Sequence, residues 1–167
     1  MKQKKRRKLP LLWHLMAIIM ACLYLLMCIT LSVTMHYSLR TLRGQIDSVL
    51  MSTVVTLANQ PAIGKIVEQG YIDQQMSDYL TDVIVNTENM QFITIADKHS
   101  IRIYHVEPAL IGLPFEGGDE GRALEGEIYI SDAAPVNHAK QRRAFHPVLN
   151  ENEEVIGFVM ASATFEQ

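Results

Sequence analysis

The stretch QFITIADKHSIRIYH, residues 91–105, sets the fold class of this chain. Its two ends, QFITIAD and IRIYH, are rich in the β-branched and aromatic residues that strands favour. The four residues between them, Asp97-Lys98-His99-Ser100, are polar and typical of a turn. The stretch therefore predicts a β-hairpin, with strands over residues 91–97 and 101–105.

Three further strands are predicted towards the C-terminus. They cover EIYIS (residues 127–131), RRAFHPVLN (142–150) and VIGFVMASAT (155–164), and the acidic turn ENEE joins the last two. A glycine-rich loop, from Val106 to about Gly126, separates the second strand from the third. Because the connections are mostly short, we expect antiparallel pairing in this sheet.

Helical patterns precede the hairpin. Between Met35 and Pro61, apolar residues recur every three or four positions, which predicts a helix that ends at the proline. Its apolar stripe consists of Leu39, Leu42, Ile46 and Val49, a spacing that fits a coiled-coil dimer and packing on the domain's own sheet equally well. Two shorter helices are predicted over AIGKIVEQG (62–70) and DQQMSDYLTDVIVNTEN (73–89). Helices followed by a run of strands indicate an α+β fold, in which a five-stranded antiparallel sheet carries helices on one side.

The first 33 residues have the composition of a membrane anchor. Residues 11–33 contain no Asp, Glu, Lys or Arg, and a helix of this length extends roughly 35 Å, enough to cross a hydrocarbon core of about 30 Å. The tail before it, residues 1–10, contains six Lys or Arg residues and no acid, which predicts a cytoplasmic N-terminus. We therefore expect a single-pass protein of the inner (plasma) membrane, whose residues 34–167 form a periplasmic or extracellular domain.

The part predicted to lie outside the membrane is acidic. The chain has 15 Lys and Arg residues and 18 Asp and Glu residues, and six of the basic residues lie in the first eight positions. Residues 34–167 therefore hold 9 basic and 18 acidic residues, a formal charge of −9. This charge argues against nucleic-acid binding, which requires a basic surface. Both cysteines, Cys22 and Cys28, lie in the apolar segment, so the exported part has no disulfide.

FEGGDEG, residues 115–121, contains four of the five residues of the diguanylate cyclase signature. The fifth position is Gly121 instead of Phe, and no phosphate-binding glycine loop is present. The histidines of the second half lack the close spacing of common zinc sites; they are His99, His105, His138 and His146. No serine or cysteine lies in a recognisable triad motif. We therefore expect no enzymatic activity, no bound metal and no cofactor, and we interpret Asp119 and Glu120 as solvent-facing turn residues.

Basic residues of the predicted sheet favour an anion site. Arg102 and His105 lie on the second strand, and Arg143 begins the fourth. Guanidinium groups bind carboxylates through two parallel hydrogen bonds, so two arginines would suit a molecule with a carboxylate at each end. Strict alternation puts Arg102 and His105 on opposite faces, so a common site requires the strand to end or bulge near Tyr104. Arg142 would replace Arg143 if the register slips by one residue.

Two motifs extend this pattern. Arg102 and His105 form R-x-x-H, which is followed by P-x-x-I-G-x-x-F-x-G-G-D (residues 108–119) and later by R-x-F-x-P (143–147). In this order behind an anchor, they resemble the extracytoplasmic PAS-like (Cache) sensor domain of the C4-dicarboxylate and citrate sensor histidine kinases. The resemblance implies that a small ligand is bound by Arg102, His105, Phe115, Arg143 and Phe145.

The resemblance also implies a function in two-component signal transduction. Citrate sensors usually carry an Arg-Lys pair after the third strand, where this chain has Ser131-Asp132-Ala133-Ala134. The ligand expected is therefore a C4-dicarboxylate such as fumarate, malate or succinate. The segment SDAAPVNHAKQR, residues 131–142, is expected to wall the pocket.

The expected partners are the small carboxylate, the inner membrane, and either a second copy of the chain or a full-length sensor kinase. In the family a second span and a kinase follow the sensor domain, whereas this sequence ends at Gln167. A fragment of a longer protein and a stand-alone module both stay open. The alternatives are a degenerate interaction or dimerisation module, a fragment of a citrate sensor kinase, and a fragment of a chemoreceptor.

Overall fold

The structure is a computed structural model that describes residues 11–133 and 141–164, without the side chains of residues 39 and 133. Contacts divide the chain into two compact units, residues 1–43 and 44–167. The helices are α1 (Leu11–Ala58), α2 (Pro61–Gln69), α3 (Gln74–Asn86), the 3-10 turn η1 (Pro108–Leu110) and α4 (Gly121–Leu124). The strands are β1 (Met90–Asp97), β2 (Arg102–His105), β3 (Tyr129–Ala133), β4 (Gln141–Leu149) and β5 (Val155–Thr164).

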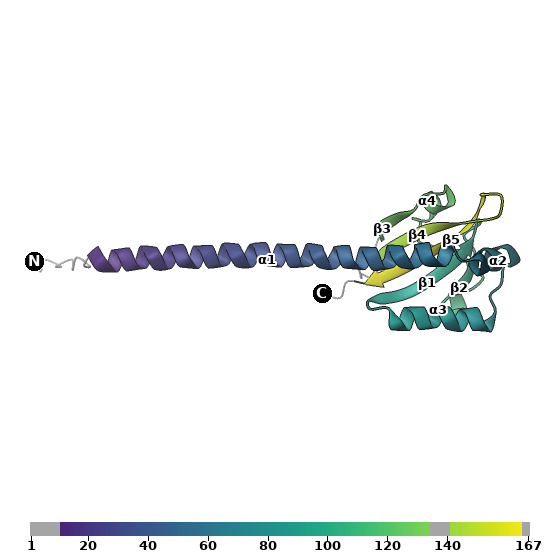
Figure 1. The fold of residues 1–167 in the computed structure, drawn as a ribbon, viewed down its shortest axis with the longest axis horizontal. Coiled ribbons are helices and arrows are strands. Elements are labelled where there is room, and N and C mark those ends of the chain that lie inside the picture. The colour runs from purple at the N-terminus through teal and green to yellow at the C-terminus, as the bar shows by residue number, and fades with distance from the viewer. Residues whose placement is uncertain (1–10, 134–140, 165–167) are drawn as a thin grey trace, which may run out of the picture. The chain divides into compact units, whose positions relative to one another are not determined.

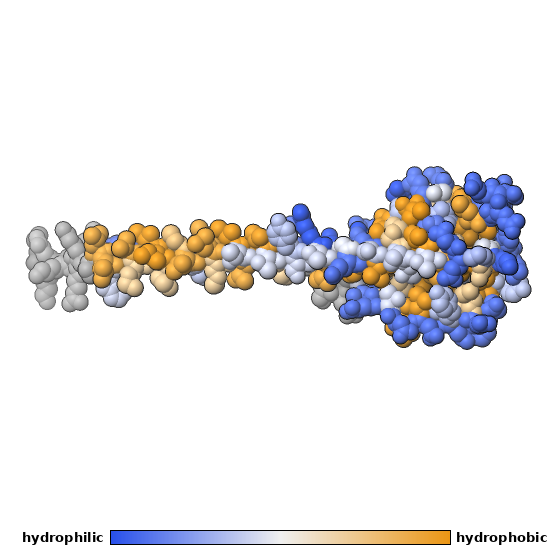
Figure 2. Space-filling view, in the orientation of Figure 1, coloured by the Kyte–Doolittle hydropathy of each residue, from blue (hydrophilic) through white to orange (hydrophobic). Residues whose placement is uncertain are grey.

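The predicted span and the predicted helix after it form one continuous helix, α1, of 48 residues. Within the described residues, α1 is the one helix long and apolar enough to cross a membrane, by length and composition. Its large apolar side chains before residue 34 are exposed, and Figure 2 shows hydrophobic colours along most of this part.

Five strands form one antiparallel sheet in the order β2-β1-β5-β4-β3 (Figure 1). Both predicted hairpins are confirmed, since β1 pairs with β2 and β4 with β5. At the first turn, the Asp97 side chain accepts hydrogen bonds from the backbone N–H groups of His99 and Ile101. The predicted strand bounds agree with the observed ones to within one residue, except for β3. This strand begins and ends two residues later than EIYIS.

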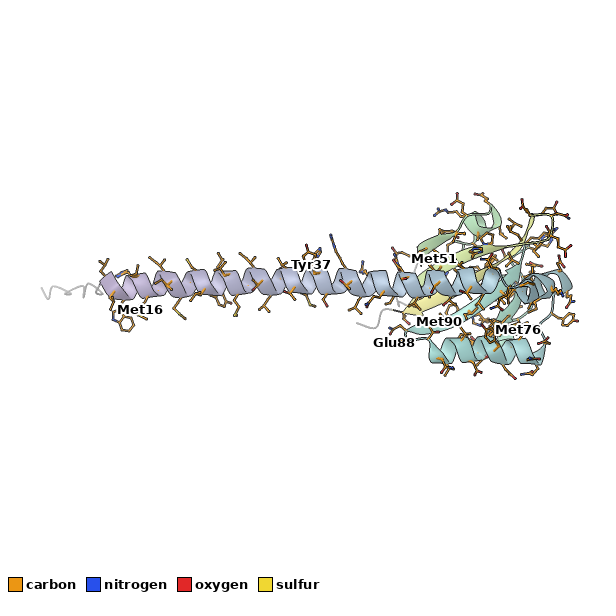
Figure 3. All side chains as sticks on the ribbon, in the orientation of Figure 1. Met16, Tyr37, Met51, Met76, Glu88 and Met90 are labelled. Carbon is orange, nitrogen blue, oxygen red and sulfur yellow. The ribbon has the colours of Figure 1, made fainter. Side chains whose placement is uncertain are left out.

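One face of the sheet packs against the end of α1, α2 and α3. The buried side chains of this helical side include Leu50, Val54 and Leu57 of α1, against Ile93 and Ile95 of β1. Three methionines pack against the same core; they are Met51, Met76 and Met90, which come from α1, α3 and β1 (Figure 3). Two of these helices begin at residues that favour a helix start. Pro61 stands in the first turn of α2, and the Asp73 carboxylate caps α3.

The apolar stripe of α1 divides between two environments. Ile46 is partly buried against the helical-side core, and its successors Leu50 and Val54 are fully buried there. Leu42 and Val49 stay 50% and 40% exposed, and the side chain of Leu39 lies outside the described residues. The last turns of α1 therefore pack on the domain's own sheet, but of the described stripe residues Ile46 packs there and Leu42 and Val49 do not.

The opposite face of the sheet is not bare. The single turn α4 packs on it through Ala123, which is buried with aromatic residues of β3, β4 and β5. Figure 1 shows α4 near β3 and β4, away from α3. The expectation that all helices lie on one side is therefore wrong for this one turn, which the glycine-rich loop contributes.

A bidentate ion pair joins α1 to the sheet. Nε and Nη2 of Arg142 each donate to an oxygen of Asp47 at 2.6 Å, and Nη1 donates to Asp132 of β3. The Asp47 and Arg142 side chains are only 24% and 21% exposed. The hydrogen bond with Asp47 is the main cause that raises the pKa of Arg142. Arg142 therefore faces the helical side, and its charge is already paired.

We expect Asp47→Asn to lower the free energy of unfolding by about 1–2 kcal/mol, because it removes the charge from a partly buried, charge-assisted pair while Asp132 still holds Arg142. Urea unfolding of the detergent-solubilised chain, followed by the near-ultraviolet circular dichroism of its tyrosines, measures this change. Glu88→Gln is the matched control, since Glu88 is exposed (Figure 3). Equal stability of the two variants would contradict a stabilising ion pair.

Candidate functional site

The face of the sheet opposite α1–α3 carries a cluster of aromatic side chains. Phe145 of β4 stacks on Tyr129 of β3, with ring centroids 5.1 Å apart and planes at 8°. Phe115, from the loop after β2, meets Phe145 and Phe158 edge to face at 6.1 and 5.6 Å. Both sequence-predicted aromatic residues, Phe115 and Phe145, are therefore buried on one face and in contact.

A bulge in β2 brings Arg102 and His105 to this same face. In the pairing with β1, Tyr104 lies opposite Ile95 and Arg102 opposite Ala96, so Ile103 has no partner. Ile103 and Tyr104 both pack into the helical-side core. The expectation that the strand bulges near Tyr104 is confirmed, because the extra residue reverses the alternation between Arg102 and His105.

Arg102 and His105 face the aromatic cluster from β2. The guanidinium carbon of Arg102 lies 5.4 Å from the centroid of the Phe115 ring, and the His105 ring lies 5.1 Å from that of Phe92. Nδ1 of His105 accepts a hydrogen bond from the backbone N–H of Glu107 at 2.9 Å. Burial, and then the charge of Arg102, lower the pKa of His105. The neutral ring therefore carries its proton on Nε2, which is available as a donor.

Arg143 approaches the same ring from β4. Its guanidinium carbon lies 5.7 Å from the Phe115 centroid, and the residue is only 5% exposed. The two arginines come from strands that are not neighbours, and both guanidinium groups therefore lie close to one phenylalanine ring. Arg142 points to the opposite face and pairs with Asp47, so Arg143, and not Arg142, lies on the aromatic face.

The acids of the loop are not solvent-facing, contrary to expectation. Oδ1 of Asp119 accepts a hydrogen bond from Nη1 of Arg143 at 3.1 Å, and the Asp119 side chain is only 17% exposed. Oδ2 of Asp119 and Oε2 of Glu120 are buried without a hydrogen-bond partner in the described part of the chain. Of the three acids in FEGGDEG, Glu116 alone is exposed. Asp119 turns inward because it pairs with Arg143, which is 24 positions away in the sequence. No pattern in the residues around Asp119 predicts this contact.

Backbone bonds and two glycines hold this loop over the sheet. The N–H of Phe115 donates to the carbonyl of Ser100 at 2.7 Å, and the Tyr129 hydroxyl donates to the carbonyl of Asp119. Gly118 has φ 70°, which favours glycine. A Cβ at Gly117 would overlap the Phe115 ring and the Asp119 carboxylate. The glycines of FEGGDEG thus allow Phe115 and Asp119 to approach the arginines together.

Sequence reasoning missed two hydroxyl groups on the floor of the site. Thr94 of β1 is the cross-strand partner of His105, and Ser162 of β5 is that of Arg143, so both point to the aromatic face. Thr94 Oγ1 and Ser162 Oγ are buried and have no partner among the described residues, and the same holds for Nε of Arg102 and of Arg143. A polar residue at a central position of an apolar strand was the signal available for both.

Two of the hollows in the described part of this unit involve residues considered above. One, of about 320 Å³, adjoins the arginine site, because Asp119, Tyr129 and Ser131 line it and Ser131 is the cross-strand partner of Arg143. The other, of about 260 Å³, lies between the α1–α2 turn and the β4–β5 turn and includes His146. His99 is exposed, and His138 and most of the segment expected to wall the pocket (residues 134–140) lie outside the described residues.

The family of the chain follows from comparison with known proteins. The model of the family described as single cache domain 3 matches residues 41–161, well over half of the chain. The chain belongs to the single cache domain 3 family. The resemblance to Cache sensor domains is therefore confirmed, and the match includes all five predicted site residues.

Relatives of this single cache domain are parts of sensor kinases. Sensor histidine kinase DcuS of Escherichia coli strain CFT073 is 34% identical over 83 residues, which are 48% of this chain and 14% of that protein. A probable C4-dicarboxylate sensor kinase of Halalkalibacterium halodurans is 35% identical over 72 residues, 43% of this chain and 13% of that protein. The crystal structure of the E. coli DcuS sensor domain matches with a TM-score of 0.64 and 27% identity, over 72% of this chain and 90% of that one. The α+β, PAS-like fold is confirmed, and the chain matches the sensor domain of these kinases.

We expect Gly117→Ala to lower the free energy of unfolding by about 1–3 kcal/mol, because the new methyl group overlaps Phe115 and Asp119 and forces the loop to shift. Gly121→Ala is the control in the same loop, since a Cβ there meets nothing within 4 Å. Urea unfolding of the detergent-solubilised chain compares the two. Equal losses in both variants would show that the close approach at Gly117 does not constrain the loop.

The lowered pKa of His105 makes stability depend on pH. The unfolded chain, with an ordinary histidine pKa of 6.5, takes up a proton at a higher pH than the folded chain does. The contribution of His105 is thus fully present above pH 6.5 and is lost as the pH falls through the folded-state pKa. Between pH 7.5 and 5.5, we expect His105→Gln to lose less free energy of unfolding than the wild type and than the exposed control His99→Gln. Identical slopes for the three proteins would contradict this.

Proposed function

We propose that this chain is the extracytoplasmic ligand-binding part of a membrane sensor, and that it binds a C4-dicarboxylate such as fumarate, malate or succinate. The observation that carries the proposal is that two arginines lie close to the same ring, that of Phe115, and that each has a buried Nε with no partner in the described residues. Buried donors of this kind are costly unless a partner fills them. A carboxylate at each end of one small molecule supplies that partner twice.

The spacing of the strands suits a short molecule. β2 and β4 are separated by β1 and β5, so their backbones are roughly 14 Å apart at about 4.8 Å per strand. Both arginines extend from these strands towards Phe115, which leaves room for a chain of a few carbons between the guanidinium groups. Phe115 and Phe145 offer apolar surface to those carbons, while Thr94, Ser162 and Nε2 of His105 offer hydrogen bonds to carboxylate oxygens.

The relatives support the same class of ligand. The aligned kinase from H. halodurans is described as a probable C4-dicarboxylate sensor kinase. R-x-x-H and R-x-F-x-P both lie within residues 41–161, which match the family model. The apolar start of α1 would anchor the sensor in the inner membrane, with the basic tail inside and the sheet outside. Output would pass to a kinase, either as part of the same protein or as a partner.

We expect Arg143→Ala to weaken dicarboxylate binding about tenfold or more, because each charge-assisted hydrogen bond is worth about 1.5–3 kcal/mol. Isothermal titration of the detergent-solubilised chain with fumarate, malate, succinate and citrate measures the affinities. Arg142→Ala is the matched control from the neighbouring position. Arg142→Ala should lower the free energy of unfolding, because it removes the ion pair with Asp47, and should leave the affinity for dicarboxylates within about twofold of the wild type.

Two results would overturn the proposal. One is an absence of heat with all four carboxylates from a wild-type chain that unfolds cooperatively. The other is an equal loss of affinity in Arg142→Ala and Arg143→Ala, which would mean that the face of the sheet does not decide binding. Tighter binding of citrate than of every dicarboxylate would keep the sensor function and reassign its ligand.

A further inference from the structure

The carboxylate of Asp119 contacts Arg143, one of the two arginines proposed to bind the ligand. Asp119 accepts a hydrogen bond from Nη1 of Arg143, while Nη2 donates to Gln141 and Nε is left over. A ligand carboxylate can therefore reach the Nε side of Arg143 with Asp119 still in place. The Asp119 carboxylate is mostly buried, and its second oxygen has no partner in the described residues, so little around it screens its charge.

The formal charges on this face are few. Arg102 and Arg143 each contribute a positive charge, and His105 is neutral while its Nδ1 accepts from Glu107. Asp119 cancels one of the two positive charges. Glu120, whose Oε2 is also buried, adds to the negative side, whereas Arg122 is paired with Glu127 on the exposed side of Tyr129. Among the described residues, the formal charges of Arg102, Arg143, Asp119 and Glu120 thus sum to zero, so each further negative charge on a ligand adds repulsion.

We infer that Asp119 is a specificity-determining residue that selects dicarboxylates against tricarboxylates; the inference rests on the proposed function. An acceptor oxygen on Nε and one on Nη1 of the same guanidinium lie on the order of 6–7 Å apart, each about 2.9 Å from its donor. At that distance in a partly buried site, their repulsion is substantial. Because the repulsion grows with the charge of the ligand, Asp119 penalises a trianion more than a dianion of similar shape.

A general role of Asp119 in folding or in orienting Arg143 makes a different prediction. Loss of such a role weakens every carboxylate ligand by a similar factor, since all of them use Arg143. Loss of a nearby negative charge changes the ratio between ligands of different charge. The ratio of the citrate and succinate affinities therefore separates selection by charge from a structural role.

The test uses Asp119→Asn, which removes the charge and keeps the shape. Isothermal titration of the full-length, detergent-solubilised chain gives the affinities for citrate and succinate at neutral pH. We expect the citrate-to-succinate affinity ratio to rise about tenfold or more over the wild type. Glu116→Gln is the matched control, because it removes the same charge from an exposed position of the same loop; its ratio should stay within about twofold of the wild type.

Each outcome decides the matter. An unchanged ratio in Asp119→Asn, or citrate binding that stays undetectable in both proteins while succinate binds, overturns the selection by Asp119 and leaves the proposed function standing. Failure of the wild type to bind any dicarboxylate overturns both. If Asp119→Asn does not unfold cooperatively, Asp119→Ser, which leaves room for water at the same place, gives the same comparison.

Discussion

The alternation of side chains along β4 organises this domain. Arg142 and Arg143 are consecutive, so the strand sends them to opposite faces of the sheet. Arg142 reaches Asp47 on α1, and Arg143 reaches Phe115 and Asp119 over the other face. Guanidinium groups of consecutive residues thus contact the end of α1 and the candidate site. Because the two arginines are adjacent in one strand, a shift of β4 at Arg143 would also move the partner of Asp47.

The same alternation would have divided the site without its one interruption. In a regular strand, Arg102 and His105 point apart, and one of them would enter the apolar core against α3. The bulge at Ile103 places two consecutive residues, Ile103 and Tyr104, on the helical side instead. Tyr104 fills that side with its ring, and its hydroxyl lies 3.2 Å from that of Thr81. The core therefore gains a large aromatic side chain from the irregularity that brings both polar groups to the opposite face.

The sequence predicted what depends on neighbouring residues. Strand and helix bounds follow local periodicity, and Arg102, His105, Phe115, Arg143 and Phe145 were identified from two short motifs. What was missed depends on contacts between distant residues. Asp47 and Arg142 are 95 positions apart, and the inward turn of Asp119 depends on Arg143, which no local pattern reveals. The two-residue shift of β3 has a similar cause, since Tyr129 is placed by its stacking on Phe145 across the strand pair.

The unpaired polar groups of the site connect stability with function. The helical side of the sheet is closed by apolar side chains, whereas Thr94, Ser162 and both arginine Nε groups are buried on the other side without partners in the described residues. Each such group costs about 1–3 kcal/mol in a folded protein. A fold tolerates several of them in one place only if the helical side supplies a surplus of stability. A ligand that paired them would offset that cost, so its binding would raise the free energy of unfolding of the domain. FEGGDEG takes part in this arrangement, because Gly117 leaves room for Phe115 and Asp119 beside the arginines, and Asp119 already accepts a hydrogen bond from one nitrogen of Arg143.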